Sequence, residues 1–353
     1  MIKSIWLFLL LSTLLLIACN SKNEVLSELP LVESKGLKYI SPFPFGASLG
    51  INLLKTKVVY RNVVTKEFNS ITAENAMKFG ALHPSENTYF WTEADYLVSF
   101  AKNLGIRVHG HTLIWHNSLP LWITNFQGDA IAWENLFKAH IQTVVTHFKG
   151  SVVSWDVVNE AFNDDGTLRN TIWQQHLGND YVARAFQYAH EADPVALLFY
   201  NEYGHEYSSA KRTAVNNMVS DFKTRGIPIH GLGLQMHTNH IQSDANLITA
   251  INTAALTGLK IHISELDISL NKDNNQSLTL TDALAVLQAA KYKVIVKAFA
   301  ALPATQRYGI TTWNVGDADS WIRGTYNRPD WPLPFDDNYN PKPAYQGILD
   351  GLK

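Results

Sequence analysis

Two glutamates carry the chemistry that this sequence indicates. Glu160 ends the segment WDVVNE (155–160), and Glu265 lies within ISELDI (263–268). Two carboxyl groups facing one another across a cleft can cleave a glycosidic bond, because one protonates the leaving oxygen while the other attacks carbon or activates water. Ion-paired surface glutamates are the structural alternative, but both residues stand beside polar residues at the ends of apolar runs. We therefore take this pair as the candidate catalytic carboxyls.

The residues around Glu265 suggest how its negative charge is held. Glu265 and Asp267 are expected to share one face of their strand, as are Gln235 and His237, which extend the neighbouring strand beyond its apolar run. A histidine beside a carboxylate, with a second carboxylate behind it, keeps the first carboxylate ionised and oriented. We therefore expect Glu265 to be the charged group and Glu160 to be the proton donor.

Short apolar runs alternate with longer segments of helical periodicity along most of the chain. Eight strands alternating with helices predict a single-domain (β/α)8 TIM barrel over residues 42–353. A doubly wound open sheet would also alternate, but no glycine-rich phosphate loop follows the first run. The predicted strands are 45–48, 70–72, 107–110, 152–158, 197–200, 231–234, 260–263 and 309–312, and the predicted helices include 93–104, 133–148, 181–191, 210–225 and 281–302.

Polar or aromatic residues follow each predicted strand from the second to the eighth. In barrels of this kind, the carboxyl ends of the strands build the active site, whereas structural residues fill the interior layers. Residues at successive strand ends are therefore expected to converge on one cleft, although any one of them alone would mean little.

Several separated motifs resemble glycoside hydrolase family 10, the retaining endo-β-1,4-xylanases. The resemblance covers nearly the whole chain after the predicted signal peptide. It implies hydrolysis of internal β-1,4-xylosidic bonds in xylan or xylo-oligosaccharides by double displacement, without cofactor or metal, by carboxyl groups about 5–5.5 Å apart. The motifs are TAENAMK (72–78), GHTLIWH (110–116), LPLW (119–122), WDVVNEA (155–161), ISELDI (263–268), DSW (319–321), PLPFD (332–336) and PKPAY (341–345).

The resemblance also implies a role for each residue of the candidate site. Glu160 would be the general acid/base and Glu265 the nucleophile, while Asn159 would bond the 2-hydroxyl of the sugar being cleaved. His237 would contact Glu265, with Asp267 behind it. Substrate would further be bound by Gln235 at the point of cleavage, by Tyr203 on the leaving side, and on the non-reducing side by Glu74, Asn75, Lys78, His111, Trp115, Trp313 and Trp321.

Three positions depart from the family pattern. Asn314 stands where glycine usually follows the tryptophan of the eighth strand, and Gly316 where serine or threonine is common. Glu202 replaces the usual aspartate after the fifth strand. None of these changes removes a catalytic group, but they put the shape of the subsites in question.

The amino terminus predicts export and a lipid anchor. Lys3 precedes an apolar run from Ile5 to Ala18, which has the length of a signal-peptide core. The run ends in LIAC (16–19), which resembles the lipobox of bacterial lipoproteins. We therefore expect a signal peptide over 1–19, lipidation of Cys19, a polar tether over 20–41 and a membrane-anchored protein, outer-membrane, periplasmic or cell-surface in location. An ordinary signal peptide or a short anchor is the alternative.

Composition narrows the possible partners. The 29 Lys and Arg residues nearly balance the 31 Asp and Glu residues, which argues against nucleic acid as a partner. A single cysteine excludes an internal disulfide. The 10 tryptophans fit sugar binding, because the flat faces of pyranose rings stack on indole. We expect a monomer that contacts the membrane only through its amino-terminal anchor.

Three other functions can be weighed against the same residues. A non-enzymatic binding protein on this scaffold would typically lack one of the two carboxyls. A cellulase could use the same pair, with discrimination resting on crowding near ring carbon C5 by Glu74, Lys78 and Trp321. A metal-dependent barrel hydrolase could draw its ligands from His109, His111, His237, His240, Asp317 and Asp319, although such enzymes usually carry the His-x-His pair after the first strand.

Overall fold

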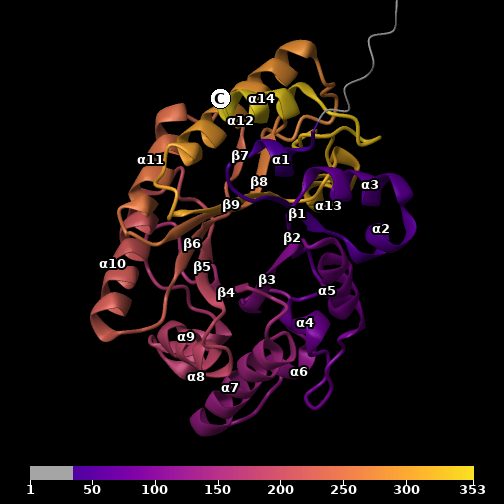
Figure 1. Ribbon diagram of the computed structural model, residues 1–353. Helices are drawn as coiled ribbons and strands as arrows, with labels where there is room; N and C mark the ends of the chain where they lie inside the picture. The colour runs from indigo at the N-terminus through magenta and orange to yellow at the C-terminus, as the bar shows by residue number, and fades with distance from the viewer. Residues whose placement is uncertain (1–34) are drawn as a thin grey trace, which may run out of the picture. The chain divides into compact units, whose positions relative to one another are not determined.

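Eight parallel strands close into a ring at the centre of the structure, with helices around its outside (Figure 1). The computed structural model describes residues 35–353. The ring closes because β9 pairs with β1, and β6 pairs with β8. The predicted (β/α)8 barrel is therefore confirmed. Its strands are β1 (Phe45–Leu49), β2 (Ser70–Ala73), β3 (Arg107–Ile114), β4 (Ser154–Asn159), β5 (Leu197–Glu202), β6 (Gly231–Leu234), β8 (Lys260–Ser269) and β9 (Arg307–Thr312).

One further strand lies outside the ring and was not predicted. The short strand β7 (His237–Asn239) pairs in parallel with the far end of β8, and His237 lies opposite Asp267 in this register. The pairing places the two side chains next to each other at the mouth of the barrel. The three-residue length of β7 explains why no apolar run marks it in the sequence.

The helices cover the outer face of the ring and begin at polar capping residues. Asp129 caps α7 through a 2.8 Å bond from Ala132 N, and Ser208 caps α10. The five predicted helices are confirmed with shifted ends as α5 (Thr92–Leu104), α7 (Ala130–His147), α9 (Tyr181–Ala192), α10 (Ser209–Arg225) and α12 (Asp282–Ala300). The others are α1 (Leu37–Ile40), α2 (Ile51–Thr56), α3 (Val58–Glu67), α4 (Phe79–Leu82), α6 (Leu121–Thr124), α8 (Ile172–Leu177), α11 (Asp244–Ala255), α13 (Trp321–Tyr326) and α14 (Pro343–Gly351), with a 3₁₀ turn at Asp317–Asp319.

The last helix, α14, packs closely against α12 (Figure 1). A β-carbon at Gly347 would lie 2.2 Å from the backbone oxygen of Ala289, and one at Gly351 would lie 2.8 Å from that of Lys293. Only glycine allows the two helix backbones to approach this closely. The carboxyl-terminal segment is thus fastened to the helix layer next to β8 and β9.

The structured domain begins earlier than its predicted boundary at residue 42. Its compact unit starts at Lys35, and Leu37 in α1 is fully buried. The Leu37 backbone N–H donates a 2.9 Å bond to the buried Glu67. Residues 35–41 therefore belong to the barrel domain and not to the predicted tether, because they pack into its core. The predicted signal peptide (1–19), Cys19 and the rest of the tether lie outside the described residues.

Within residues 35–353, none of the helices has both the length and the apolar character needed to cross a membrane.

Candidate active site

A cavity of about 700 Å³ opens at the carboxyl ends of the barrel strands. It is lined by thirteen of the residues that the sequence predicted for the site, while Asp267 lies behind the lining. Asn117, Tyr207, Thr325 and Tyr326 line it too and were not predicted. The predicted lining residues are Glu74, Asn75, Lys78, His111, Trp115, Asn159, Glu160, Tyr203, Gln235, His237, Glu265, Trp313 and Trp321.

Glu160 accepts hydrogen bonds on both oxygens from uncharged side chains. Trp115 Nε1 donates to Oε2 at 2.9 Å, and Gln235 Nε2 donates to Oε1 at 2.9 Å. Asn159 Nδ2 lies 3.3 Å from the same Oε1. Glu160 follows the last residue of β4, and its backbone has a positive φ of 59°. The carboxyl group is therefore held in one orientation at the edge of the cavity.

Glu265 lies in β8 and accepts hydrogen bonds from a charged group and an amide. His237 Nε2 lies 3.1 Å from Oε2, and Asn201 Nδ2 donates to Oε1 at 2.7 Å. The other ring nitrogen of His237 lies 2.8 Å from Asp267 Oδ2. Glu265, His237 and Asp267 thus form one hydrogen-bonded chain that starts in the cavity and ends in the barrel wall.

The charges of this chain favour an ionised Glu265. Burial lowers the pKa of His237, but the neighbouring Asp267 and Glu265 raise that pKa well above its usual 6.5, so the ring is a cation. Burial raises the pKa of Glu265, but the hydrogen bond from His237 and the charges of His111 and His237 outweigh it. The pKa of Glu265 therefore lies below its usual 4.5, which favours the ionised carboxylate.

A buried aspartate supports the floor of the cavity. Asp156 Oδ2 lies 2.9 Å from His111 Nδ1, and Asp156 Oδ1 lies 3.0 Å from His109 Nε2. Burial raises the pKa of Asp156, but the two histidines lower it far below its usual range. Asp156 therefore orients His111, which lines the cavity next to Trp313.

The wall beyond His111 carries a lysine between aromatic rings. Lys78 Nζ donates to Asn75 Oδ1 at 2.9 Å and lies 5.2 Å from the ring centre of Trp115 and 5.9 Å from that of Trp313. Burial lowers the pKa of Lys78 although the nearby Glu265, Glu74 and Glu160 raise it. Hydrogen-bonding groups and flat apolar rings side by side are the combination that a sugar requires.

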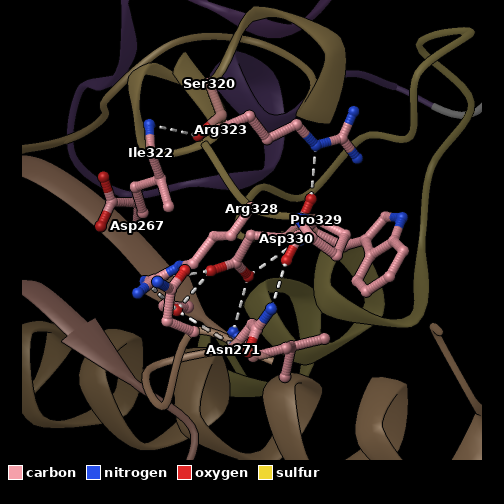
Figure 2. Close-up of polar contacts among 12 residues, drawn as sticks. Asp267, Asn271, Ser320, Ile322, Arg323, Arg328, Pro329 and Asp330 are labelled. Atoms are coloured by element: carbon pink, nitrogen blue, oxygen red, sulfur yellow. Dashed lines mark hydrogen bonds and ion pairs between the residues drawn. The ribbon is translucent and has the colours of Figure 1, made fainter. Parts of the chain in front are cut away.

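The side of the cavity formed by α13 is fastened to the end of β8. Trp321 Nε1 donates a 2.8 Å bond to Asp267 Oδ2. Further along the chain, the buried Asp330 accepts bonds from Ser269 Oγ and from the backbone N–H groups of Leu270 and Trp331. Figure 2 shows Asp330 next to Arg328, with which it forms an ion pair. The segment that carries Trp321 and the strand that carries Glu265 are therefore joined twice.

One departure from the family pattern has a structural reason. Asn314 has a φ of 85°, a conformation in which glycine is the usual residue and asparagine is tolerated. Its side-chain oxygen accepts a hydrogen bond from Trp321 N at 3.3 Å, and its own N–H donates to Ser48 Oγ at 2.8 Å. Asparagine can therefore replace glycine here and also hold the start of α13.

Sequence reasoning missed three residues with clear roles in the geometry. Asn201 links Glu265 to Asn159, because its amide donates to the Glu265 carboxylate and, at 3.0 Å, to Asn159 Oδ1. Asp156 supports His111, and Arg169 holds the backbone of Glu160. Asp156 stands on the predicted strand 152–158, and Asn201 directly follows the predicted strand 197–200, so a count of polar residues on and after the strands would have found both. Arg169 lies in a loop and gives no such signal.

Among residues 35–353, no three His, Cys, Asp or Glu side chains are grouped so as to hold a metal ion. The metal-dependent alternative therefore has no donor set in this part of the chain.

Comparison with known proteins agrees with this geometry. The sequence model of glycosyl hydrolase family 10 matches residues 37–351. The chain belongs to glycosyl hydrolase family 10. Among curated relatives in family 10, endo-1,4-beta-xylanase A of Cellvibrio japonicus is 42% identical over 90% of this chain, which spans 56% of that relative. Endo-1,4-beta-xylanase B of Paenibacillus barcinonensis is 37% identical over 90% of this chain and 98% of its own length.

A solved family 10 structure has the same fold. It is a mutant of xylanase 10C from Cellvibrio japonicus in complex with xylopentaose, similar to this chain with a TM-score of 0.86 and 37% sequence identity. The match covers 91% of this chain and 69% of that one. A sequence identity of 37% indicates membership of the same family and not only a shared barrel fold.

Proposed function

We propose that this protein is an endo-1,4-β-xylanase that hydrolyses internal xylosidic bonds with retention of configuration. The proposal rests on the different surroundings of two carboxyls in one cavity. Glu265 is bonded to a cationic histidine, which stabilises its ionised form. Glu160 accepts hydrogen bonds from the neutral donors Trp115, Gln235 and Asn159. His116 Nε2 lies 4.0 Å from its Oε2, and burial lowers the pKa of this histidine. One group suits attack on carbon, and the other suits proton transfer.

The reaction would proceed in two displacements. In the first, the Glu265 carboxylate forms a bond to the anomeric carbon while the bond from that carbon to the leaving oxygen breaks, and the oxygen takes the proton of Glu160. In the second, the Glu160 carboxylate removes a proton from water, which attacks the anomeric carbon and releases Glu265. The sum is the addition of one water molecule across the glycosidic bond.

The remaining residues of the cavity are assigned to substrate binding in this proposal. Asn159 would contact the 2-hydroxyl of the sugar being cleaved, and Gln235 would act beside it. Tyr203 would lie on the leaving side. The non-reducing side would be bound by Glu74, Asn75, Lys78, His111, Trp115, Trp313 and Trp321. The names of the curated relatives support xylan as the substrate, and the xylopentaose bound in the solved relative supports a chain of several xylose units.

Product analysis on xylan, carboxymethyl cellulose and mannan, side by side, tests the proposed activity. We expect rapid loss of xylan viscosity with oligosaccharides of mixed length as the first products, and little release from the other two polymers. Faster cleavage of the cellulose derivative would favour the glucanase alternative. Release of a single short product from the start would contradict internal cleavage.

We also propose that the protein is an exported, monomeric lipoprotein that is anchored through Cys19, as the sequence predicts. Labelling of cells with a radioactive fatty acid tests this location. The wild-type chain should carry label and sediment with membranes, whereas Cys19→Ser should be unlabelled. Equal labelling of both chains would contradict the assignment.

A further inference from the structure

The backbone of Glu160 has a conformation that non-glycine residues rarely adopt. Its φ of 59° lies in the left-handed region, which contacts of the β-carbon disfavour. Such a residue keeps this conformation only where its surroundings impose it. The imposing contacts therefore also decide where the carboxyl of the proposed acid/base points.

Hydrogen bonds hold the peptide groups on both sides of Glu160. Its own N–H donates to the backbone oxygen of Asn201 at 3.0 Å, and its backbone oxygen accepts from Arg169 Nε at 3.1 Å. One residue further, Ala161 N donates to the hydroxyl of Tyr200 at 2.9 Å. Together these contacts fix the peptide planes from which the Glu160 side chain emerges.

Glu202 is at the centre of this arrangement. Its side chain is fully buried at the end of β5 and accepts bonds from Phe162 N at 3.2 Å and from the Tyr200 hydroxyl at 2.7 Å. Its second oxygen accepts from Tyr203 N at 3.1 Å. One carboxyl group thus connects the segment that follows Glu160 to the residue that lines the leaving side.

A buried lysine and an arginine extend the network to the ring of Tyr203. Lys211 in α10 is fully buried, with Nζ 3.3 Å from Glu202 Oε1, 2.8 Å from Asp164 Oδ1 and 3.5 Å from the centre of the Tyr203 ring. Arg169 Nη2 donates to the Tyr203 hydroxyl at 2.9 Å and to the backbone oxygen of Phe162 at 3.1 Å. A shift of this ring would therefore disturb the hydrogen bonds that hold the backbone of Glu160.

We propose that Glu202, with Lys211, is a positioning residue that sets the orientation of Glu160 for proton transfer and couples it to the leaving-side ring of Tyr203. The inference rests on the proposed function, because it takes Glu160 as the acid/base. The contacts of Glu202 also explain why a glutamate can replace the family's usual aspartate at this position. The longer side chain contacts Phe162 N, Tyr203 N and Lys211 together.

The proposal confines the effect of Glu202 to the step that needs a proton. In the described part of the chain, the hydrogen bonds of Glu202 and Lys211 reach neither Glu265 nor its partner His237. Attack by the nucleophile should therefore continue normally where the leaving group requires no acid. A general loss of folding or of substrate binding would instead slow all substrates alike.

Two aryl β-xylobiosides separate these possibilities. The 2,4-dinitrophenyl glycoside has a leaving group that departs without a proton, whereas the phenyl glycoside needs one. For Glu202→Gln we expect kcat/KM to fall at least tenfold on the phenyl substrate and less than twofold on the dinitrophenyl substrate. Lys211→Met keeps the bond to Phe162 N, so it should give a smaller loss, about threefold, with the same selectivity.

A matched control replaces another buried glutamate. Glu67 accepts bonds from Leu37 N and the Tyr345 hydroxyl, away from the cavity. Glu67→Gln should lower thermal stability and leave the ratio of the two kcat/KM values unchanged. If Glu202→Gln yields no folded protein, the ratio of the two kcat/KM values for Lys211→Met alone tests the positioning role.

The outcomes distinguish this inference from the proposed function. Equal losses on both substrates in Glu202→Gln, or in Lys211→Met where it decides, would overturn the positioning role while leaving the catalytic assignment intact. The assignment itself is tested by Glu160→Gln on the same pair of substrates. If that variant showed no selective loss on the phenyl glycoside, the acid/base role would fail, and the positioning role with it.

Discussion

Trp321 donates a hydrogen bond to the carboxylate that supports the proposed nucleophile, Glu265. Its indole nitrogen lies 2.8 Å from Asp267 Oδ2, the same oxygen that accepts from His237. The position of one wall of the cavity and the charge of Glu265 therefore depend on one aspartate. A change that loosens the segment after Trp321 should affect substrate binding and stability together.

Asp330→Asn tests this connection. The buried carboxylate accepts from Leu270 N and Trp331 N on Oδ1, and from Ser269 Oγ and Arg328 Nη2 on Oδ2. An asparagine keeps the first oxygen but places an NH2 group where the second one accepted, so it loses the contacts on Oδ2. We expect the free energy of unfolding to fall by about 1–3 kcal/mol and KM for xylohexaose to rise several-fold, measured by urea unfolding and initial rates.

Asp337→Asn is the matched control, because Asp337 forms an exposed ion pair with Arg323 on the same segment. Such a pair is worth about 1 kcal/mol or less. Equal effects of the two substitutions would contradict the importance of the buried contacts of Asp330.

His237→Asn should move the pH dependence of the reaction. A nucleophilic carboxylate must be ionised, and His237 lowers the pKa of Glu265, the proposed nucleophile, below its ordinary value. Without the cation the pKa of Glu265 rises, so the acidic limb of kcat/KM should shift to higher pH, and the rate should fall about 10- to 100-fold. The profile is best measured with 2,4-dinitrophenyl β-xylobioside, which needs no acid.

His240→Asn is the control for this shift, because His240 contacts the backbone oxygen of Ser269 and not a carboxylate. An unchanged acidic limb in His237→Asn would mean that the histidine does not hold the charge of Glu265.

Glu206→Gln should flatten the pH dependence of stability. Burial raises the pKa of Glu206 to about 7 from its usual 4.5. The folded chain then keeps a proton that the unfolded chain releases, so stability falls as pH rises from 4.5 through 7. In the variant, the decrease in the free energy of unfolding over this pH range should be smaller by roughly 3 kcal/mol. Urea unfolding from pH 4 to 8 measures it, and the two proteins should be nearly equal at pH 4. A wild-type slope in the variant would contradict the burial argument.

The periodicity of the sequence was enough to predict the barrel, because parallel strands buried on both faces are apolar runs. Residues that follow such runs, such as Trp115, Glu160 and Gln235, were predicted to share one cleft because the carboxyl ends of barrel strands converge. The three-residue β7 was missed, since so short a strand has no pattern of its own. Arg169 was missed because it lies in the loop between β4 and α8, where no strand or helix periodicity marks a residue that turns toward the site.

Glu160 and Glu265, the proposed catalytic pair, should differ in their importance for activated and natural substrates. Glu265→Ala removes the attacking group, so it should abolish cleavage of all substrates. Glu160→Ala should lose xylan hydrolysis, by about 10²-fold or more, yet keep turnover of the dinitrophenyl glycoside. Initial rates on both substrates measure this. Equal loss in the two variants would contradict the division of labour.

The most direct test is to trap the covalent intermediate. A 2-deoxy-2-fluoro-β-xylobioside with a dinitrophenyl leaving group should inactivate the enzyme with release of one equivalent of dinitrophenol. Mass spectrometry of the digested protein should then find the sugar on the peptide that contains Glu265, and on that carboxyl. Attachment to Glu160 or another residue, or a lack of attachment while xylan is cleaved with inversion, would contradict the account.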